Sequence, residues 1–180
     1  MDSCGLDRGA TEVSVTDGEY VCCFSGHRPG SLPWHTDEAD ERCLALKRRI
    51  REELDELLRS GCRHYLCGMA LGCDTYFAEA VLEIKQARPD VILEAVIPCG
   101  SQPERWSRSN RLRYNAILDR CDKVTVLQTH YTPDCMMRRN KHMVDASSLL
   151  LCCFAGTPGG TMNTILYAER NGLEVRIIEV

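Results

Sequence analysis

The chain has 180 residues, of which 44% are hydrophobic and 27% are charged, and this balance excludes wholesale disorder. Its formal net charge of -4 at pH 7 argues against a protein whose main task is to grip nucleic-acid backbones, but it leaves room for a local basic cleft. No apolar run approaches the roughly 20 residues that span a bilayer, so we expect no membrane partner.

The first residues, 1–19, are polar and lack both the basic start and the apolar centre of a secretory signal. We expect them to form a polar N-terminal tail with at most a short strand at Val13–Val15. One domain over residues 20–180 is the simplest organisation at this length. A cytoplasmic location is the default expectation for such a chain.

Apolar runs and helical patterns alternate along the rest of the sequence. The runs predict strands at 20–25, 64–68, 91–98, 123–128, 148–155 and 174–179. Helical patterns cover 36–61, a segment opened by Asp74, 108–121, 134–147 and 161–172. Thr36 is the expected N-cap of the first helix, and Gly61 stands just past its end. This alternation predicts a single three-layer, Rossmann-like α/β domain with a mainly parallel sheet of about six strands.

The sequence contains twelve cysteines and no C-x-x-C pair, the close spacing on which zinc sites normally draw. The adjacent pairs Cys22-Cys23 and Cys152-Cys153 lie inside apolar runs, where neighbouring side chains of a strand point to opposite faces. We therefore expect reduced cysteines that pack in the core as small hydrophobes, and no metal site. A metal or redox role is the alternative.

Unusual residues follow the first, second and fifth predicted strands. Ligands of parallel sheets bind beyond the carboxyl ends of the strands, so these turns supply the candidate ligand and phosphate-binding residues. The candidates are Ser25, Gly26, His27, Arg28, Gly68, Met69, Gly72, Asp74, Gly156, Thr157, Gly159, Gly160 and Thr161.

Two of these turns, "CGMALGCD" and "GTPGGT", place glycines directly before a helix. A helix N-terminus with small residues before it offers free backbone N–H groups and a positive dipole end to an anion. With His27 and Arg28 nearby, the turns predict a pocket for a phosphorylated small molecule. Short connections also need glycine for purely structural reasons, His27 could bond the backbone instead, and Arg28 could pair with an acidic neighbour.

Two further segments carry candidates. In "MMRRNKHMVDAS", Arg139 suits bidentate recognition of phosphate or carboxylate, and Asn140 could read a ribose or a base edge. Arg138 either faces the same crevice or belongs to a solvated helix face. In "ERWSRSNRLRYN", arginines and aromatic residues interleave, which is typical of a lid or of a surface that stacks bases. As part of a lid over the crevice, Trp106 would stack on a purine; the alternative is a surface or interface aromatic.

The chain resembles the YpsA/YoqJ-like bacterial family in the stretches "SGHRP", "GMALGCDTYFAEAVLE", "IPCGSQPERW" and "RRNKHMVDAS…GTPGGTMNTILYAE". That family belongs to the SLOG superfamily, named for the DNA-processing protein DprA (Smf) and the LOG cytokinin-activating hydrolases. The resemblance covers about residues 20–178. It implies a Rossmann-like fold that binds a nucleotide, ADP-ribose or an NAD-like ligand, with no required cofactor.

The resemblance holds at some positions of these stretches and fails at others. "CGMALGCD" is similar to the phosphate turn of the DprA branch at Gly68, Gly72 and Asp74, and "RRNKHM" is similar to a LOG segment at Arg139 and Met143.

The LOG motif that ends in a catalytic glutamate is matched only in part. This chain keeps its Pro158-Gly159-Gly160, but Leu166 stands at the glutamate position and Glu169 lies three residues further on. That offset is about 5 Å along a helix, too far for a carboxylate that must reach its target, and it argues against LOG-type hydrolysis.

Three functions follow from these observations. The first is a binding module, acting as a sensor, for a small nucleotide-derived ligand such as ADP-ribose or NAD. The alternative is an N-glycosidase or phosphoribohydrolase of nucleoside monophosphates, in which Arg139, Glu169 or Asp74 are the catalytic candidates. The third is DprA-like binding of single-stranded DNA, which the acidic balance disfavours. A homo-oligomer is compatible with each.

Overall fold

The computed structural model describes residues 19–180, so the expected N-terminal tail and the strand at Val13–Val15 lie outside the described residues. The strands are β1 (Val21–Gly26), β2 (His64–Cys67), β3 (Ile92–Ile97), β4 (Lys123–Val126), β5 (Leu149–Phe154) and β6 (Glu174–Glu179). The helices are α1 (Glu41–Arg59), α2 (Cys73–Ala87), α3 (Arg108–Leu118), α4 (Cys135–Asp145) and α5 (Gly160–Arg170), and a 3-10 turn, η1 (Pro29–Ser31), follows β1.

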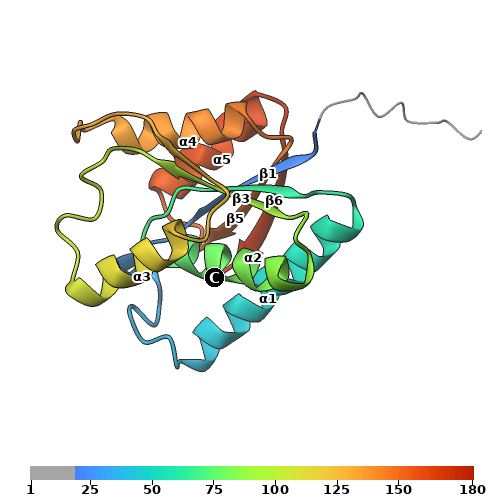
Figure 1. The fold of residues 1–180 in the computed structure, drawn as a ribbon, viewed down its shortest axis with the longest axis horizontal. Helices are drawn as coiled ribbons and strands as arrows, with labels where there is room; N and C mark the ends of the chain where they lie inside the picture. Colours follow the sequence, from blue (N-terminus) through green and yellow to red (C-terminus); the bar gives the residue numbers. More distant parts are fainter. Residues whose placement is uncertain (1–18) are drawn as a thin grey trace, which may run out of the picture.

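The six strands form one sheet in the order β4-β3-β2-β1-β5-β6, and every neighbouring pair is parallel. Helices α1, α2 and α3 cover one face, and α4 and α5 cover the other (Figure 1). The three-layer, Rossmann-like architecture expected from the sequence is therefore confirmed. Strand order reverses between β1 and β5, and such a switch point leaves a crevice beyond the carboxyl ends of the two strands.

The inner strands are buried on both faces because helices cover both. Along β1, Cys22 joins the core under α1–α3 while Cys23 joins the core under α4 and α5, as the alternation of a strand requires. Ten of the eleven cysteines in residues 19–180 are buried and none of the eleven is paired. The edge strands differ: β4 is mostly exposed, with Val124 and Val126 facing solvent.

Helix boundaries follow local chemistry, with one correction. Thr36 does not cap the first helix; the cap is Asp40, whose carboxylate accepts a hydrogen bond of 2.8 Å from the backbone N–H of Arg42. Residues 36–40 form turns before the helix instead. The expected strands agree with the observed ones to within one or two residues. Within residues 19–180, no helix combines the length and apolarity needed to cross a membrane.

Candidate functional site

A cavity of about 280 Å³ lies at the switch point between β1 and β5, and we name it the switch-point cavity. Its walls come from the end of β1, the start of α2, one face of α4 and the turn that opens α5. Most of the candidate residues line it: Ser25, Gly26, His27, Arg28, Asp74, Arg139, Asn140, Thr157, Gly159, Gly160 and Thr161. The topology therefore brings four segments that are distant in sequence to one place.

The N-terminus of α5 forms one wall and is open. Gly159 is the N-cap, so no side chain caps this helix. Within residues 19–180, the backbone N–H groups of Gly160, Thr161 and Met162 make no hydrogen bond to the protein. A Cβ added at Gly160 would meet no atom within 4 Å, so the space in front of the helix is free. This wall presents unsatisfied donors and the positive end of a helix dipole.

Arg28 places an exposed positive charge at the rim of the cavity. It is exposed, and in the described part of the chain no hydrogen bond or ion pair holds its guanidinium. It also lines a second cavity beside the first. An arginine without an internal partner at a cavity rim can bind an anion in bidentate fashion at no cost in broken contacts.

His27 has a structural role and is not a second cation. Its side chain is buried, and Nε2 accepts a hydrogen bond of 2.9 Å from the backbone N–H of Ala155. A nitrogen that accepts must be unprotonated, and burial lowers the pKa of this imidazole. Its ring also stacks on Phe154. His27 thus ties the end of β1 to the end of β5 in its neutral form.

The turn 67–74 is satisfied by its own side chain. The carboxylate of Asp74 accepts a hydrogen bond of 3.0 Å from the backbone N–H of Ala70, at the place where a bound anion would be expected. Burial raises the pKa of Asp74, and the guanidinium of Arg139 opposes that rise. The turn that most resembles the DprA phosphate turn therefore carries an internal carboxylate, although Asp74 itself still borders the cavity.

Arg139 is the partner of this carboxylate. It is only 5% exposed, its Nη1 lies 3.9 Å from Asp74 Oδ2 and donates to the carbonyl of Gly68, and its Nε donates to Asn140 Oδ1 at 2.7 Å. Burial lowers the pKa of Arg139 and Asp74 raises it. The guanidinium is already engaged on several sides although it lines the cavity, and its contact with a ligand stays a prediction.

Asn140 is engaged as well. Its oxygen accepts from Arg139, and its Nδ2 donates at 2.7 Å to Thr164 Oγ1, which in turn donates to the carbonyl of Gly160 at 2.8 Å. This chain of bonds fixes α4 against the first turn of α5. Asn140 thus holds that helix start in position while it lines the cavity, and its contact with a ribose or base edge stays a prediction.

Four candidate residues lie away from the switch-point cavity: Gly68, Met69, Gly72 and Gly156. Two of these glycines are required by internal packing. A Cβ at Gly68 would lie 1.8 Å from Arg139 Nη1, and one at Gly72, where φ is +89°, would lie 2.6 Å from the carbonyl oxygen of His27. Gly26, which does line the cavity, has the same constraint from Cys73 at 2.4 Å.

The catalytic candidate Glu169 is also displaced. It is exposed near the C-terminal end of α5, nine residues beyond Gly160, which is roughly 13 Å of helix. Leu166, which stands at the position of the LOG glutamate, is 40% exposed and has no carboxylate. Among the described residues that line the switch-point cavity, Asp74 is the one that has a carboxylate.

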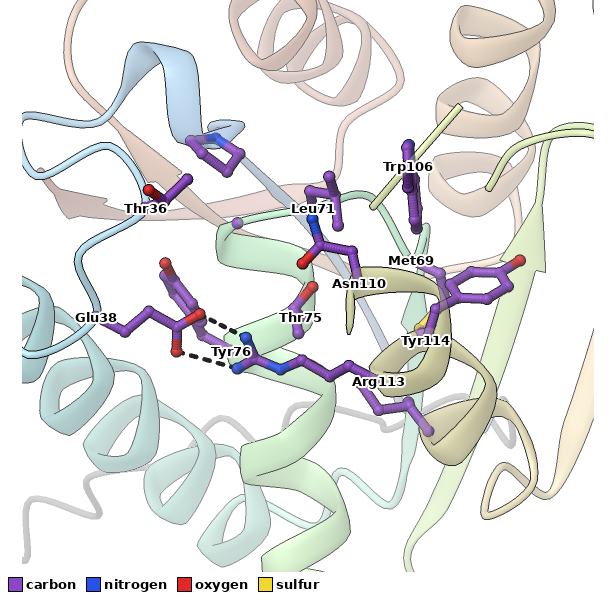
Figure 2. A pocket seen from close by; sticks show the side chains of 13 residues that line it. Thr36, Glu38, Met69, Leu71, Thr75, Tyr76, Trp106, Asn110, Arg113 and Tyr114 are labelled. Carbon is purple, nitrogen blue, oxygen red and sulfur yellow. Dashed lines mark hydrogen bonds and ion pairs between the residues drawn. The ribbon is translucent and has the colours of Figure 1, made fainter. Parts of the chain in front are cut away.

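A second cavity adjoins the first, and a third adjoins the second. The second, of about 440 Å³, is named here the tryptophan cavity; Trp106 lines it, and Arg28 and Met136 border both it and the switch-point cavity. The third, of about 90 Å³, is drawn in Figure 2, where Glu38 and Arg113 face each other and are joined by hydrogen bonds. Trp106, Leu71 and Pro29 line both of these cavities and so form the wall between them.

Sequence reasoning missed some lining residues. Met136 was not singled out, although it stands three and four positions before Arg139 and Asn140 and thus on the same helix face. Ser31 and Gln102 carried no signal beyond their place after β1 and β3. A rule that takes the first five residues after each strand would have found Ser31 and Gln102.

Comparisons with known proteins agree with this architecture. UPF0398 proteins of Bacillus thuringiensis (strain Al Hakam) and Bacillus cereus (strain AH187) are each 25% identical over 158 residues, covering 86% of this chain and 85% of theirs. Among solved structures, the DNA processing protein A of Helicobacter pylori, described with a single-stranded DNA binding mode, matches with a TM-score of 0.59 and 16% identity. The match covers 89% of this chain and 66% of that one.

DprA of Streptococcus pneumoniae matches with the same TM-score of 0.59 and 16% identity, over 88% of this chain and 50% of that one. The present chain therefore spans between half and two thirds of these DprA structures, and the likeness concerns the fold. The family model of YpsA matches residues 22–179, almost the whole described chain. The chain belongs to the YspA SLOG family.

Proposed function

We propose that this protein binds a nucleotide or a nucleotide-derived phosphorylated molecule, of the ADP-ribose or NAD class, in the switch-point cavity. The observation that carries the proposal is the open N-terminus of α5 facing a cavity that the unpaired Arg28 also borders. Free backbone donors, a helix dipole and a guanidinium together favour a phosphate group. A sensor function in the cytoplasm fits the unpaired cysteines, which are stable in a reducing compartment.

Calorimetric titration with ADP-ribose, NAD and AMP tests this proposal. Gly160→Val places a branched side chain in the open space before the free amides, so we expect about a tenfold or larger loss of affinity with the fold intact. Asn163→Val, on the exposed side of the same helix turn, is the matched control. Absence of binding by every nucleotide, or equal affinity of Gly160→Val and the wild type, would contradict the proposal.

Arg28→Ala gives an independent measure of the same site. A charge-assisted hydrogen bond contributes roughly 1.5–3 kcal/mol, so we expect affinity to fall by about 10- to 150-fold. Because Arg28 has no partner within residues 19–180, its removal leaves no internal group unsatisfied and the thermal stability of the free protein should not change.

Hydrolysis is the alternative that the cavity supports less well. With Glu169 distant, Asp74 would have to serve as the acid or base, and it is already bonded to the turn 67–74. Chromatography of AMP incubated with the protein distinguishes the two readings. Release of free adenine would favour an N-glycosidase, while ligand-induced stabilisation with no turnover favours a binding protein.

Single-stranded DNA is a second candidate ligand, favoured by the fold likeness to DprA and by the exposed arginines beside Trp106. The net charge of -4 opposes it. Binding of an oligonucleotide whose affinity falls steeply with salt would support this candidate, since phosphate contacts release counterions.

A further inference from the structure

The tryptophan cavity has the composition of a pocket for a flat, uncharged ring. Its walls include the indole of Trp106 and the phenol of Tyr131, which is 61% exposed although it is a large aromatic side chain. These two residues come from different loops, the one after β3 and the one after β4. Aromatic faces at a cavity rim stack on bases, whatever the base, because every base has a π-face.

Polar groups of the same cavity include an acceptor for the amino group of a base. Glu104 contributes a carboxylate, which accepts hydrogen bonds from amino groups, and Arg28 and Arg105 balance its charge. Gln102 is only 9% exposed, and its Nε2 donates to the carbonyls of Gly68 (3.3 Å) and Met69 (3.0 Å).

The amide of Gln102 is thereby oriented, and its oxygen has no hydrogen-bond partner within residues 19–180. A buried acceptor without a donor is costly, and an amino group that entered the cavity would satisfy it. The Gln102 oxygen is enclosed by the surrounding chain, so a hydrogen bond from a ligand amino group needs a small shift of the cavity wall. The stacking contact with Trp106 is therefore the main contact to the base.

The switch-point cavity and the tryptophan cavity are neighbours. Arg28 and Met136 line both, so these side chains form the boundary between the wall of free α5 amides and the aromatic wall. Volumes of about 280 and 440 Å³ together fall in the range of roughly 300–1,000 Å³ found for small-molecule sites. The smaller switch-point cavity suits an anionic group, and the larger tryptophan cavity suits a ring.

From this juxtaposition we infer that the tryptophan cavity is the nucleobase subsite of the same ligand, an amino-bearing base stacked against Trp106 while its phosphate lies at α5. The inference rests on the proposed function and deepens it, since it selects base-bearing nucleotides over sugar phosphates. Arg28, at the junction, would lie near the linkage between ribose and phosphate.

Fluorescence gives a direct test because the chain contains only two tryptophans, Trp34 and Trp106. In a Trp34→Phe variant all indole emission comes from Trp106. Stacking quenches that emission, so AMP and ADP-ribose should quench it on binding, whereas ribose 5-phosphate should bind in calorimetry without quenching. Circular dichroism checks that Trp34→Phe, a substitution of a buried side chain, retains the fold.

Calorimetry on Trp106→Ala in the otherwise unaltered chain tests the subsite without the Trp34 substitution. We expect AMP affinity to fall about 5- to 150-fold, the range for loss of one base stack, with ribose 5-phosphate affinity unchanged. Trp106→Phe should retain most of the AMP affinity. Leu112→Ala, which alters a 60% exposed side chain of α3 outside both cavities, is the matched control and should bind like the wild type.

The outcomes separate the two proposals. If ribose 5-phosphate binds and Trp106→Ala binds AMP like the wild type, or loses both ligands equally, the subsite is wrong and the phosphate site stands. If no probe binds the wild-type chain, the proposed function fails and the subsite fails with it. A selective loss of AMP by Trp106→Ala supports both.

Discussion

Replacement of Arg139 by alanine distinguishes a structural cation from a ligand-binding one. In the structure this guanidinium is 5% exposed, lies 3.9 Å from Asp74 Oδ2, and bonds the carbonyl of Gly68 and the side chain of Asn140. Its loss leaves the buried carboxylate of Asp74 without its counter-ion and removes one of the two side-chain donors to the carbonyl of Gly68, which keeps Gln102 Nε2. Removing one partner of a buried ion pair costs about 3–5 kcal/mol, so Arg139→Ala should lower the free energy of unfolding by that amount.

Urea denaturation followed by circular dichroism measures this change, and a thermal scan should show a decrease of roughly 6–20 °C in Tm, at about 2–4 °C per kcal/mol for a domain of this size. Arg138→Ala is the control. That neighbour is exposed and donates only to Gln128 at 3.0 Å, so its removal should change stability by no more than about 0.5 kcal/mol.

The effect should depend on pH in a defined direction. Burial already raises the pKa of Asp74 above its usual value, and Arg139 restrains the rise. A carboxyl whose pKa is raised by folding stabilises the fold below its unfolded pKa of about 3.9, and this contribution is lost as the pH rises through the folded pKa. Without Arg139 the folded pKa rises further, so the destabilisation should be larger at pH 7 than at pH 4.

Gly68 supplies an internal check on the same geometry. A Cβ there would lie 1.8 Å from Arg139 Nη1, so Gly68→Ala should be strongly destabilising in the wild type and much less so once Arg139 is alanine. The reasoning would be refuted by an Arg139→Ala variant as stable as Arg138→Ala that has lost nucleotide affinity. Such a result would make Arg139 a ligand contact.

Three further expectations follow from single contacts. Gly72→Ala should destabilise by roughly 1–3 kcal/mol in urea denaturation, because φ is +89° and the new Cβ would lie 2.6 Å from the carbonyl of His27. His27 has a lowered pKa, so its contribution is present above about pH 6.5 and is lost as the pH falls through the folded pKa; His27→Ala should reduce the acid-side slope of stability between pH 7 and 5. Ser107→Ala should cost about 1 kcal/mol of thermal stability, since the hydroxyl caps α3 through the N–H of Asn110 at 3.2 Å.

The fold was largely accessible from the sequence because its signals are local. Continuous apolar runs such as 148–155 and glycine stops such as Gly61 report which residues a strand buries and where a helix ends. The N-cap of α1 was placed four residues early, at Thr36, because both Thr36 and Asp40 are capping residue types and the sequence does not say which carboxylate or hydroxyl reaches a free N–H.

The candidate site was accessible only in outline. Its position follows from topology, since the ends of β1 and β5 meet at the switch point. The roles of individual residues do not follow, because a glycine needed for a phosphate and one needed for close packing look alike in sequence. Likewise, Arg139 and Arg28 are the same residue type. The structure distinguishes them, because Arg139 is buried and bonded to protein groups, whereas Arg28 has no partner within residues 19–180.

The two glycine-bearing turns, at the starts of α2 and α5, therefore have different roles. At the start of α2, Asp74 accepts the N–H of Ala70 and pairs with Arg139, so the positive end of that helix already faces an anion of its own. At the start of α5 the described chain places no such carboxylate, and no protein group accepts from the first N–H groups, which are open to solvent or to a bound anion. An anion that binds at α5 displaces no internal carboxylate, whereas one at α2 would compete with Asp74. Phosphate contacts should accordingly concentrate on Gly160 and Thr161, while changes in the turn 67–74 should act on stability first.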